Sequence, residues 1–247
     1  MKVKYFRICV SIAIIFSLWL TGSFIVGNDL LLPGPVKTIQ RLAELFISGE
    51  IFSPLLFTAL KALGGLSLAL LFSLITGFAM GLIEILYEIF KPIIITLQAI
   101  PIVSWLALAI LWWGVGFRSP LYIVFLTLFP IITLNITEGV KNVDKKLLEM
   151  ARVFNLSKKI VFKDIYFASA MPFIVSSLRI SSGMMWKTVA VAEFMVGISG
   201  LGRMISDAKY ALNTTDVFAF TVILIILGIV SEIIFDKLSR RMMVRAS

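Results

Sequence analysis

The feature that most constrains this chain is a series of apolar segments, each about 20 residues long, with few or no charged residues. A helix of that length crosses the hydrocarbon core of a lipid bilayer. The 247 residues are 60% hydrophobic and 15% charged, whereas soluble domains lie near one half and one quarter. The short alternating strands of a membrane barrel are absent from the sequence. We therefore expect an all-α polytopic membrane protein that forms one transmembrane domain over residues 1–247.

About six transmembrane helices are expected, and they cover residues 6–26, 53–83, 92–113, 120–137, 169–196 and 217–236. With this arrangement, 15 of the 23 Lys and Arg residues lie on the inner side and five on the outer side. The asymmetry follows the positive-inside rule, so both chain ends are expected in the cytoplasm. The same rule explains the net charge of +9 better than nucleic-acid binding does. A cleaved signal peptide fits residues 6–26 less well, because the apolar run is long and no A-x-A site follows.

A short helix is expected between the first two spans. A Pro-Gly-Pro sequence at 33–35 breaks the chain there, and apolar residues then recur at helical spacing at Val36, Ile39, Ala43 and Phe46. This pattern favours a helix lying at the outer membrane interface, with a packed extracellular loop as the alternative.

Packing signals occur in the second and third spans. Gly77 and Gly81 form a small-xxx-small pair, which allows two helices to approach closely. A short inner loop is expected at 84–91. Pro101 is expected to kink the third span, because proline removes a backbone donor.

Four charged residues inside predicted spans are singled out: Lys61, Arg179, Lys187 and Glu193. Charged groups at this depth often mark a transport route, so all four are candidate translocation-pathway residues. Structural pairing within the bundle is an alternative role for them, and Lys61 could also snorkel to the outer headgroups. Lys187 and Glu193 are six residues apart, so they do not pair along one helix face.

The longest polar interruption, residues 138–168, carries seven Lys and Arg residues. It is more than a basic loop, because Leu147, Leu148, Ala151 and Phe154 recur between the charges at helical spacing. The pattern predicts a short amphipathic helix beside the membrane whose apolar side docks on another surface.

Capping residues define this helix and a second one. Asp144 is a good N-cap for a helix that reaches Phe154. Asn155 tolerates the left-handed conformation that closes a helix, and Ser157 can cap a second helix leading into the fifth span. The sequence therefore predicts a cytoplasmic elbow of two helices.

Several kinds of chemistry are absent from the sequence. There is no phosphate-binding loop of the G-x-x-x-x-G-K-[ST] type, no G-x-S-x-G elbow, no H-E-x-x-H motif and no EF-hand loop. The chain has no His and a single Cys, which excludes His or Cys-cluster metal sites and an intramolecular disulfide. We expect a protein that is not an enzyme and that holds no cofactor or metal.

The elbow resembles the cytoplasmic E-A-A-x-x-x-G motif of integral-membrane permeases from binding-protein-dependent ABC importers. Glu149, Ala151 and Pro172 match that pattern, and Met150, Asn155 and Ala168 depart from it. The segments LLPGPVKTI, AIPIVSWLALAILWWGVG, NITEGVKNVDKKLLEMARVFNLS and WKTVAVAEFMVGISGLGRMI are similar to the sulfonate, taurine and nitrate permease subfamily.

The resemblance implies a permease subunit in the inner membrane that works by alternating access. It implies a permease dimer, two cytosolic ABC ATPase subunits that each hold one elbow, and an extracytoplasmic solute-binding protein. The residues it assigns to ATPase coupling are Leu148, Glu149, Ala151, Arg152, Phe154, Asn155 and Leu156, with Lys158 at the rim. Leu148, Ala151 and Phe154 are expected to seat in the ATPase groove.

The resemblance favours a small anion such as a sulfonate, taurine or nitrate as the transported solute. Related permeases for bicarbonate or a pyrimidine precursor of thiamine are the alternative. A secondary transporter driven by an ion gradient, and a membrane scaffold or channel, are the competing classes, because Arg179, Lys187 and Glu193 also fit an ion-coupled carrier.

Overall fold

The computed structural model describes the backbone of residues 2–246 and the side chains of Arg7 and of residues 10–237. Five of the basic residues behind the predicted topology therefore lie outside the described side chains: Lys2, Lys4, Arg240, Arg241 and Arg245. The described backbone contains no strand, in agreement with the predicted all-α class.

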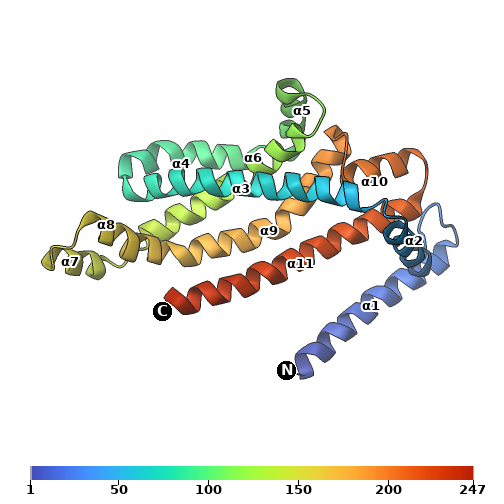
Figure 1. Cartoon of the computed structure of the whole chain (residues 1–247), viewed down its shortest axis with the longest axis horizontal. Helices are drawn as coiled ribbons and strands as arrows, with labels where there is room; N and C mark the ends of the chain where they lie inside the picture. Colours follow the sequence, from blue (N-terminus) through green and yellow to red (C-terminus); the bar gives the residue numbers. More distant parts are fainter. Residues whose placement is uncertain (1, 247) are drawn as a thin grey trace.

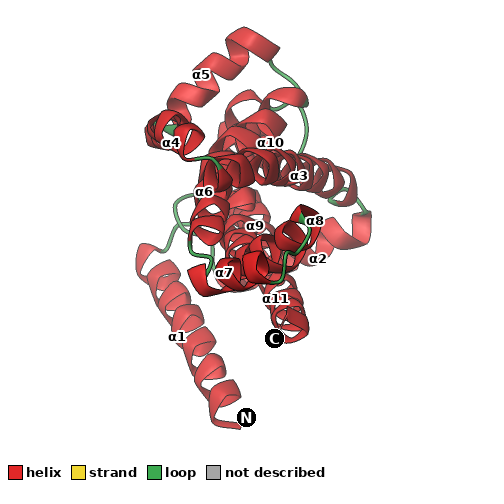
Figure 2. Ribbon diagram, turned by 90° about the vertical axis from the view of Figure 1, so that its left-hand side faces the viewer, coloured by secondary structure: helices red, strands yellow, loops and turns green. Residues whose placement is uncertain are grey.

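The helices in chain order are α1 (Lys2–Val26), α2 (Pro35–Ser48), α3 (Phe52–Leu82), α4 (Glu84–Ala99), α5 (Ile102–Trp113), α6 (Arg118–Lys141), α7 (Lys145–Val153), α8 (Lys158–Ile160), the π-helix η1 (Val161–Phe167), α9 (Ala168–Val196), α10 (Leu201–Tyr210) and α11 (Thr214–Ala246). The long helices run lengthwise, with α7 and α8 at one end and α2 and α10 at the other (Figure 1). Seen from the α7 end, α1 stands apart from the bundle (Figure 2).

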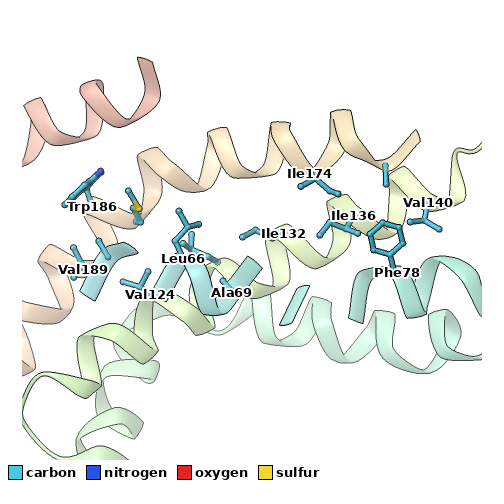
Figure 3. Close-up of a cluster of buried hydrophobic side chains, with 14 residues drawn as sticks. Leu66, Ala69, Phe78, Val124, Ile132, Ile136, Val140, Ile174, Trp186 and Val189 are labelled. Atoms are coloured by element: carbon cyan, nitrogen blue, oxygen red, sulfur yellow. The ribbon is translucent and has the colours of Figure 1, made fainter. Parts of the chain in front are cut away.

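The core lies along the contact between α3, α6 and α9 (Figure 3). Lipid tails are as apolar as leucine, so helices in a membrane associate through close packing rather than the hydrophobic effect. The Gly77 and Gly81 pair permits such packing, because a Cβ at Gly77 would lie 2.8 Å from the Cβ of Ile136, and one at Gly81 would overlap Val140. The predicted role of this pair in helix packing is confirmed.

The predicted inner loop at 84–91 is wrong, because α4 begins at Glu84, two residues after α3 ends. The predicted kink at Pro101 is larger than expected, since α4 and α5 meet at 95°. Proline disfavours helical backbone in the residue before it, and Ile100 is extended at φ −66° and ψ 122°. The third span is therefore two helices joined by a sharp break.

Four helical segments are long and apolar enough to cross a membrane: Phe52–Leu82, Arg118–Lys141, Lys158–Val196 and Thr214–Lys237. The bent pair α4 and α5 makes five if it counts as one span. The apolar part of α1, Val10–Val26, is shorter. The predicted fold class is thus confirmed among the described residues, and the number six stays a prediction.

The predicted short helix after the first span is confirmed as α2. Val36, Ile39, Ala43 and Phe46 all point outward, as an interfacial helix requires, while Leu45 packs inward near the start of α11. Arg41 Nε also donates a hydrogen bond of 2.6 Å to Asp216 at the start of α11. This hydrogen bond raises the pKa of the Arg41 guanidinium above its ordinary value.

Candidate functional site: an elbow, a buried ion pair and a groove

The predicted elbow is present, and its caps form as expected. The Asp144 side chain accepts a hydrogen bond of 2.9 Å from the backbone N–H of Lys146, which starts α7. Asn155 has φ 50°, in the left-handed region, and Leu156 N–H donates to the Ala151 carbonyl over 2.9 Å. The first bond satisfies a backbone N–H at the start of α7, and the second satisfies a carbonyl at its end; both groups would otherwise stay free.

The second helix of the elbow, α8, also forms, and the chain continues from it through a π-helix into α9. The Ser157 hydroxyl accepts a hydrogen bond of 3.4 Å from Ile160 N–H, which caps α8. The sequence did not predict that residues Val161–Phe167 adopt a π-helix before α9 begins. Such segments are rare and often occur at functional sites.

The apolar residues of α7 divide into an inner and an outer stripe. Ala151 is only 3% exposed and packs with Val143 and Ile165, and Leu148 joins the same cluster. The outward-facing apolar residues are Leu147, Met150, Val153 and Phe154. Val153 is 81% exposed and Phe154 is 70% exposed.

Ala151 is too buried to seat in a partner groove, so the expectation is corrected for that residue, and for the partly buried Leu148 it stays a prediction. Their side chains hold α7 against the π-helix, so the surface open to a partner is the outer stripe that includes Phe154. A pocket of about 310 Å³ lies between α7 and the π-helix η1, and its lining includes Arg152, Asn155 and Leu156. Glu149 and Arg152 are exposed beside the outer stripe.

A buried ion pair lies at the end of the molecule opposite the elbow, where it links α3 to α9. Lys61 on α3 and Glu193 on α9 are both 0% exposed, and Lys61 Nζ lies 2.8 Å from Glu193 Oε1. Thr58 donates to the same carboxylate over 2.8 Å and Gly202 N–H donates over 3.0 Å. Lys61 also donates to the Ser199 carbonyl over 2.6 Å. Burying charges is costly, and this network compensates by satisfying both charged groups.

Glycines allow the backbone between α9 and α10 to wrap around the Glu193 carboxylate. Gly200 has φ 109°, and a Cβ there would overlap the carboxylate. A Cβ at Gly197 would lie 2.7 Å from Glu193 Cα, and one at Gly202 would lie 2.7 Å from Glu193 Cβ. The close backbone that these glycines permit encloses the ion pair.

A groove of about 920 Å³ runs between α9 and α11. Arg179 and Lys187 line it from α9, and Glu232 lines it from α11. Arg179 pairs with Glu232 at 3.7 Å and with Asp236 at 3.2 Å. Lys187 is exposed in the groove and makes no ion pair or hydrogen bond with other described residues.

Comparison with known proteins identifies the family that shares this architecture. The family described as the inner membrane component of binding-protein-dependent transport systems matches residues 69–244. The chain belongs to this family. The resemblance seen in the elbow and in the span sequences is thereby confirmed, and the chain is an inner-membrane, multi-pass permease.

Sequence relatives of the permease match over most of its length. An aliphatic sulfonates transport permease protein of Bacillus subtilis is 30% identical over 232 residues, 94% of this chain and 84% of that protein. The taurine transport system permease protein of Escherichia coli is 27% identical and covers 94% of this chain and 86% of its own length. The nitrate import permease protein of Synechocystis is 28% identical, with coverages of 92% and 84%.

Solved structures share the fold of the permease. A chain of the inward-facing MetNI methionine ABC transporter has a TM-score of 0.64 and covers 75% of this chain and 92% of its own length. A chain of an amino acid ABC transporter with histidines has a TM-score of 0.61, with coverages of 84% and 96%. Both are 18% identical to the permease, so they establish the fold alone.

The four predicted pathway residues of the permease do not form one site. Lys61 and Glu193 form the buried ion pair, whereas Arg179 and Lys187 lie in the groove. The described residues contain no group of three or more His, Cys, Asp or Glu that could hold a metal.

The partners of Arg179 were not predicted from the sequence. Glu232 and Asp236 are four residues apart, so they share a face of α11. The sequence signal that could have identified these partners is an acidic pair at that spacing in one predicted span, together with an Arg in another. Thr58 on α3 carried no such signal, because neutral hydroxyl residues are common in membrane helices. Ser199 lies in the loop before α10, where a serine is equally ordinary.

Proposed function

We propose that this permease forms the membrane pathway of an importer whose energy comes from ATP hydrolysis on separate cytosolic subunits. The observation that carries the proposal is the elbow: a capped helix at one end of the bundle whose outer stripe is apolar and uncovered. Large exposed apolar patches mark interaction sites. Family membership supports an ATPase as the partner at this position.

In this proposal, the outer stripe of α7 seats in a groove of the ATPase. Phe154 and Met150 supply the apolar contact, and the exposed Glu149, Arg152 and Lys158 contact the rim. Leu148 and Ala151 pack on the inner side of α7 and connect it to the π-helix and so to α9, which lets movement of α7 reach α9. Movement of the ATPase pair would then reorient α9 and open the pathway alternately to each side of the membrane.

The complete transporter would contain two permease copies, two ATPases and an extracytoplasmic binding protein. The elbow and both chain termini would lie in the cytoplasm, which the distribution of basic residues supports. The transported solute would be a small anion, because relatives carry names that refer to sulfonates, taurine and nitrate. The groove between α9 and α11 is the candidate pathway surface.

Uptake by elbow variants tests the coupling assignment. Phe154→Asp places a charge on the apolar contact, and Glu149→Lys reverses a rim charge, so both are expected to abolish uptake and ATPase association. Both proteins should reach normal amounts in the membrane, since neither side chain is buried. Tyr210→Asp is the matched control, because this aromatic is 78% exposed at the opposite end and should leave ATPase association intact. Normal uptake by both elbow variants would refute the assignment.

A further inference from the structure

The groove between α9 and α11 contains positions at which the two helices leave open space. Gly183 on α9 and Gly228 on α11 both line it, and a Cβ at either position would meet no atom within 4 Å. The volume of about 920 Å³ is ample for a small solute. Most of the remaining lining is apolar, and it includes Ile180, Met184, Val191, Leu224, Ile225 and Ile229.

Charge compensation in and around the groove is complete except at one residue. Lys61 is paired with Glu193, outside the groove. Arg179, eight residues before Lys187 on α9, is paired with Glu232 and Asp236 on α11. Lys187 lies between these pairs, projects into the groove, and has no ionic partner among the described residues.

Lys187 lies well inside its membrane span, where an unpaired charge indicates a role beyond structure. It lies nine residues before α9 ends at Val196, about 13 Å along the helix axis. A charged group within a membrane span is costly unless it faces water or a counter-charge. The three carboxylates nearest along α9 and α11, those of Glu193, Glu232 and Asp236, are already paired, so a counter-charge for Lys187 would come from outside the described chain.

We propose that Lys187 is the specificity-determining residue that contacts the transported anion, and that Arg179 serves as a structural ion-pair partner. This inference rests on the proposed function of the chain as a pathway subunit. The solute that fits the groove is a small anion with a compact apolar part, such as an alkylsulfonate. Its charged group lies at Lys187, and its apolar part faces the aliphatic side chains of α9 and α11.

Anion binding to the purified full-length transporter tests the proposal directly. The thermal unfolding midpoint is measured with rising concentrations of ethanesulfonate, taurine and nitrate, because a ligand that binds the folded state raises it. At least one of these anions is expected to raise the midpoint of the wild type. Lys187→Met should lose this shift, and Lys187→Arg should keep it. Lys209→Met is the matched control, because that lysine lies over the rings of Phe194 on α9 and Tyr210 on α10, outside the groove, and its loss should leave the shift unchanged.

Uptake of the same anion into proteoliposomes supplies the second measurement. A charged hydrogen bond is lost in Lys187→Met, so the uptake rate should fall about tenfold or more, while Lys187→Arg should stay within about threefold. ATP-driven uptake that is equal in Lys187→Met and wild type would overturn this inference and leave the proposed function standing. Absence of ATP dependence in the wild type would instead overturn the proposed function.

Three further results would overturn the inference. The first is a wild-type midpoint that none of the three anions shifts. The second is loss of the two-copy assembly in Lys187→Met, which would assign this lysine to a contact between subunits. The third is a shift produced only by an anionic phospholipid, which would assign the groove to lipid.

Discussion

Lys61 and Glu193 show how a single buried contact can join three elements of this fold. The carboxylate accepts hydrogen bonds from α3 through Thr58 and from α10 through Gly202, in addition to its ion pair. Removing one partner from a buried pair leaves an uncompensated charge, which costs more than the pair itself contributes. The network therefore acts as a fixed joint at the end of the molecule opposite the elbow.

Lys61→Met and Glu193→Gln are each expected to lower the free energy of unfolding by about 3–5 kcal/mol. The double variant should lose less than the sum of the two, because the partners interact directly. Thermal unfolding in detergent measures these effects. Arg203→Met is the control, since its pair with Asp207 is exposed and should contribute at most about 1 kcal/mol. Equal midpoints for Lys61→Met and Arg203→Met would show that the buried pair is not a stabilising joint.

Sequence reasoning could identify the charged residues in spans, but it could not pair them. Lys61 and Glu193 are separated by 132 residues, and no local periodicity relates positions that far apart. Pairing along one helix could be excluded for Lys187 and Glu193 from spacing alone, and the structure agrees. Which cation remains unpaired depends on the packing of α9 against α11.

At the scale of elements, the elbow was predictable because its signals are local. Asp144, Asn155 and Ser157 each act within a few residues, and all three occupy the predicted caps. The direction of the apolar residues was not predictable, because α7 carries two apolar stripes and the sequence does not show which one the following helix covers. The π-helix had no sequence signal, since its pattern of apolar residues is also compatible with an α-helix.

The close contact between α3 and α6 leads to a prediction about stability. Gly77→Ala is expected to destabilise the protein by about 1–3 kcal/mol, because the added methyl group would overlap Ile136. Gly183→Ala is the matched control within a helix, where a Cβ meets no atom within 4 Å. It should stabilise the protein by about 0.5–1 kcal/mol through reduced backbone entropy. Unfolding midpoints of the two variants, measured under the same conditions, test this difference in stability. Equal effects of the two substitutions would contradict the packing described.

For the whole molecule, the charge asymmetry of the sequence predicts which end faces the cytoplasm. The structure places the elbow at one end and α10 at the other, as that orientation requires (Figure 1). The 95° break between α4 and α5 was beyond sequence reasoning, because Pro101 is equally compatible with a kink in one continuous span. The size of a bend depends on how the neighbouring helices pack against the two bent segments.

Cysteine labelling tests this orientation. In a Cys9→Ser background, Val153→Cys should react with a membrane-impermeant maleimide only when the cytoplasmic side is accessible. Tyr210→Cys should react only from the outer side, and both positions are highly exposed. Labelling of both positions from the same side would contradict the proposed topology.

Transport by purified components is the most direct test of the central claim that a separate ATPase drives this pathway through the elbow. Proteoliposomes would contain the permease, the ATPase that co-purifies with it and the loaded binding protein. Solute uptake is predicted to require ATP and the binding protein together, and to be lost in Phe154→Asp while Tyr210→Asp retains it. Uptake by the permease alone, driven by an ion gradient and unaffected by Phe154→Asp, would contradict the account.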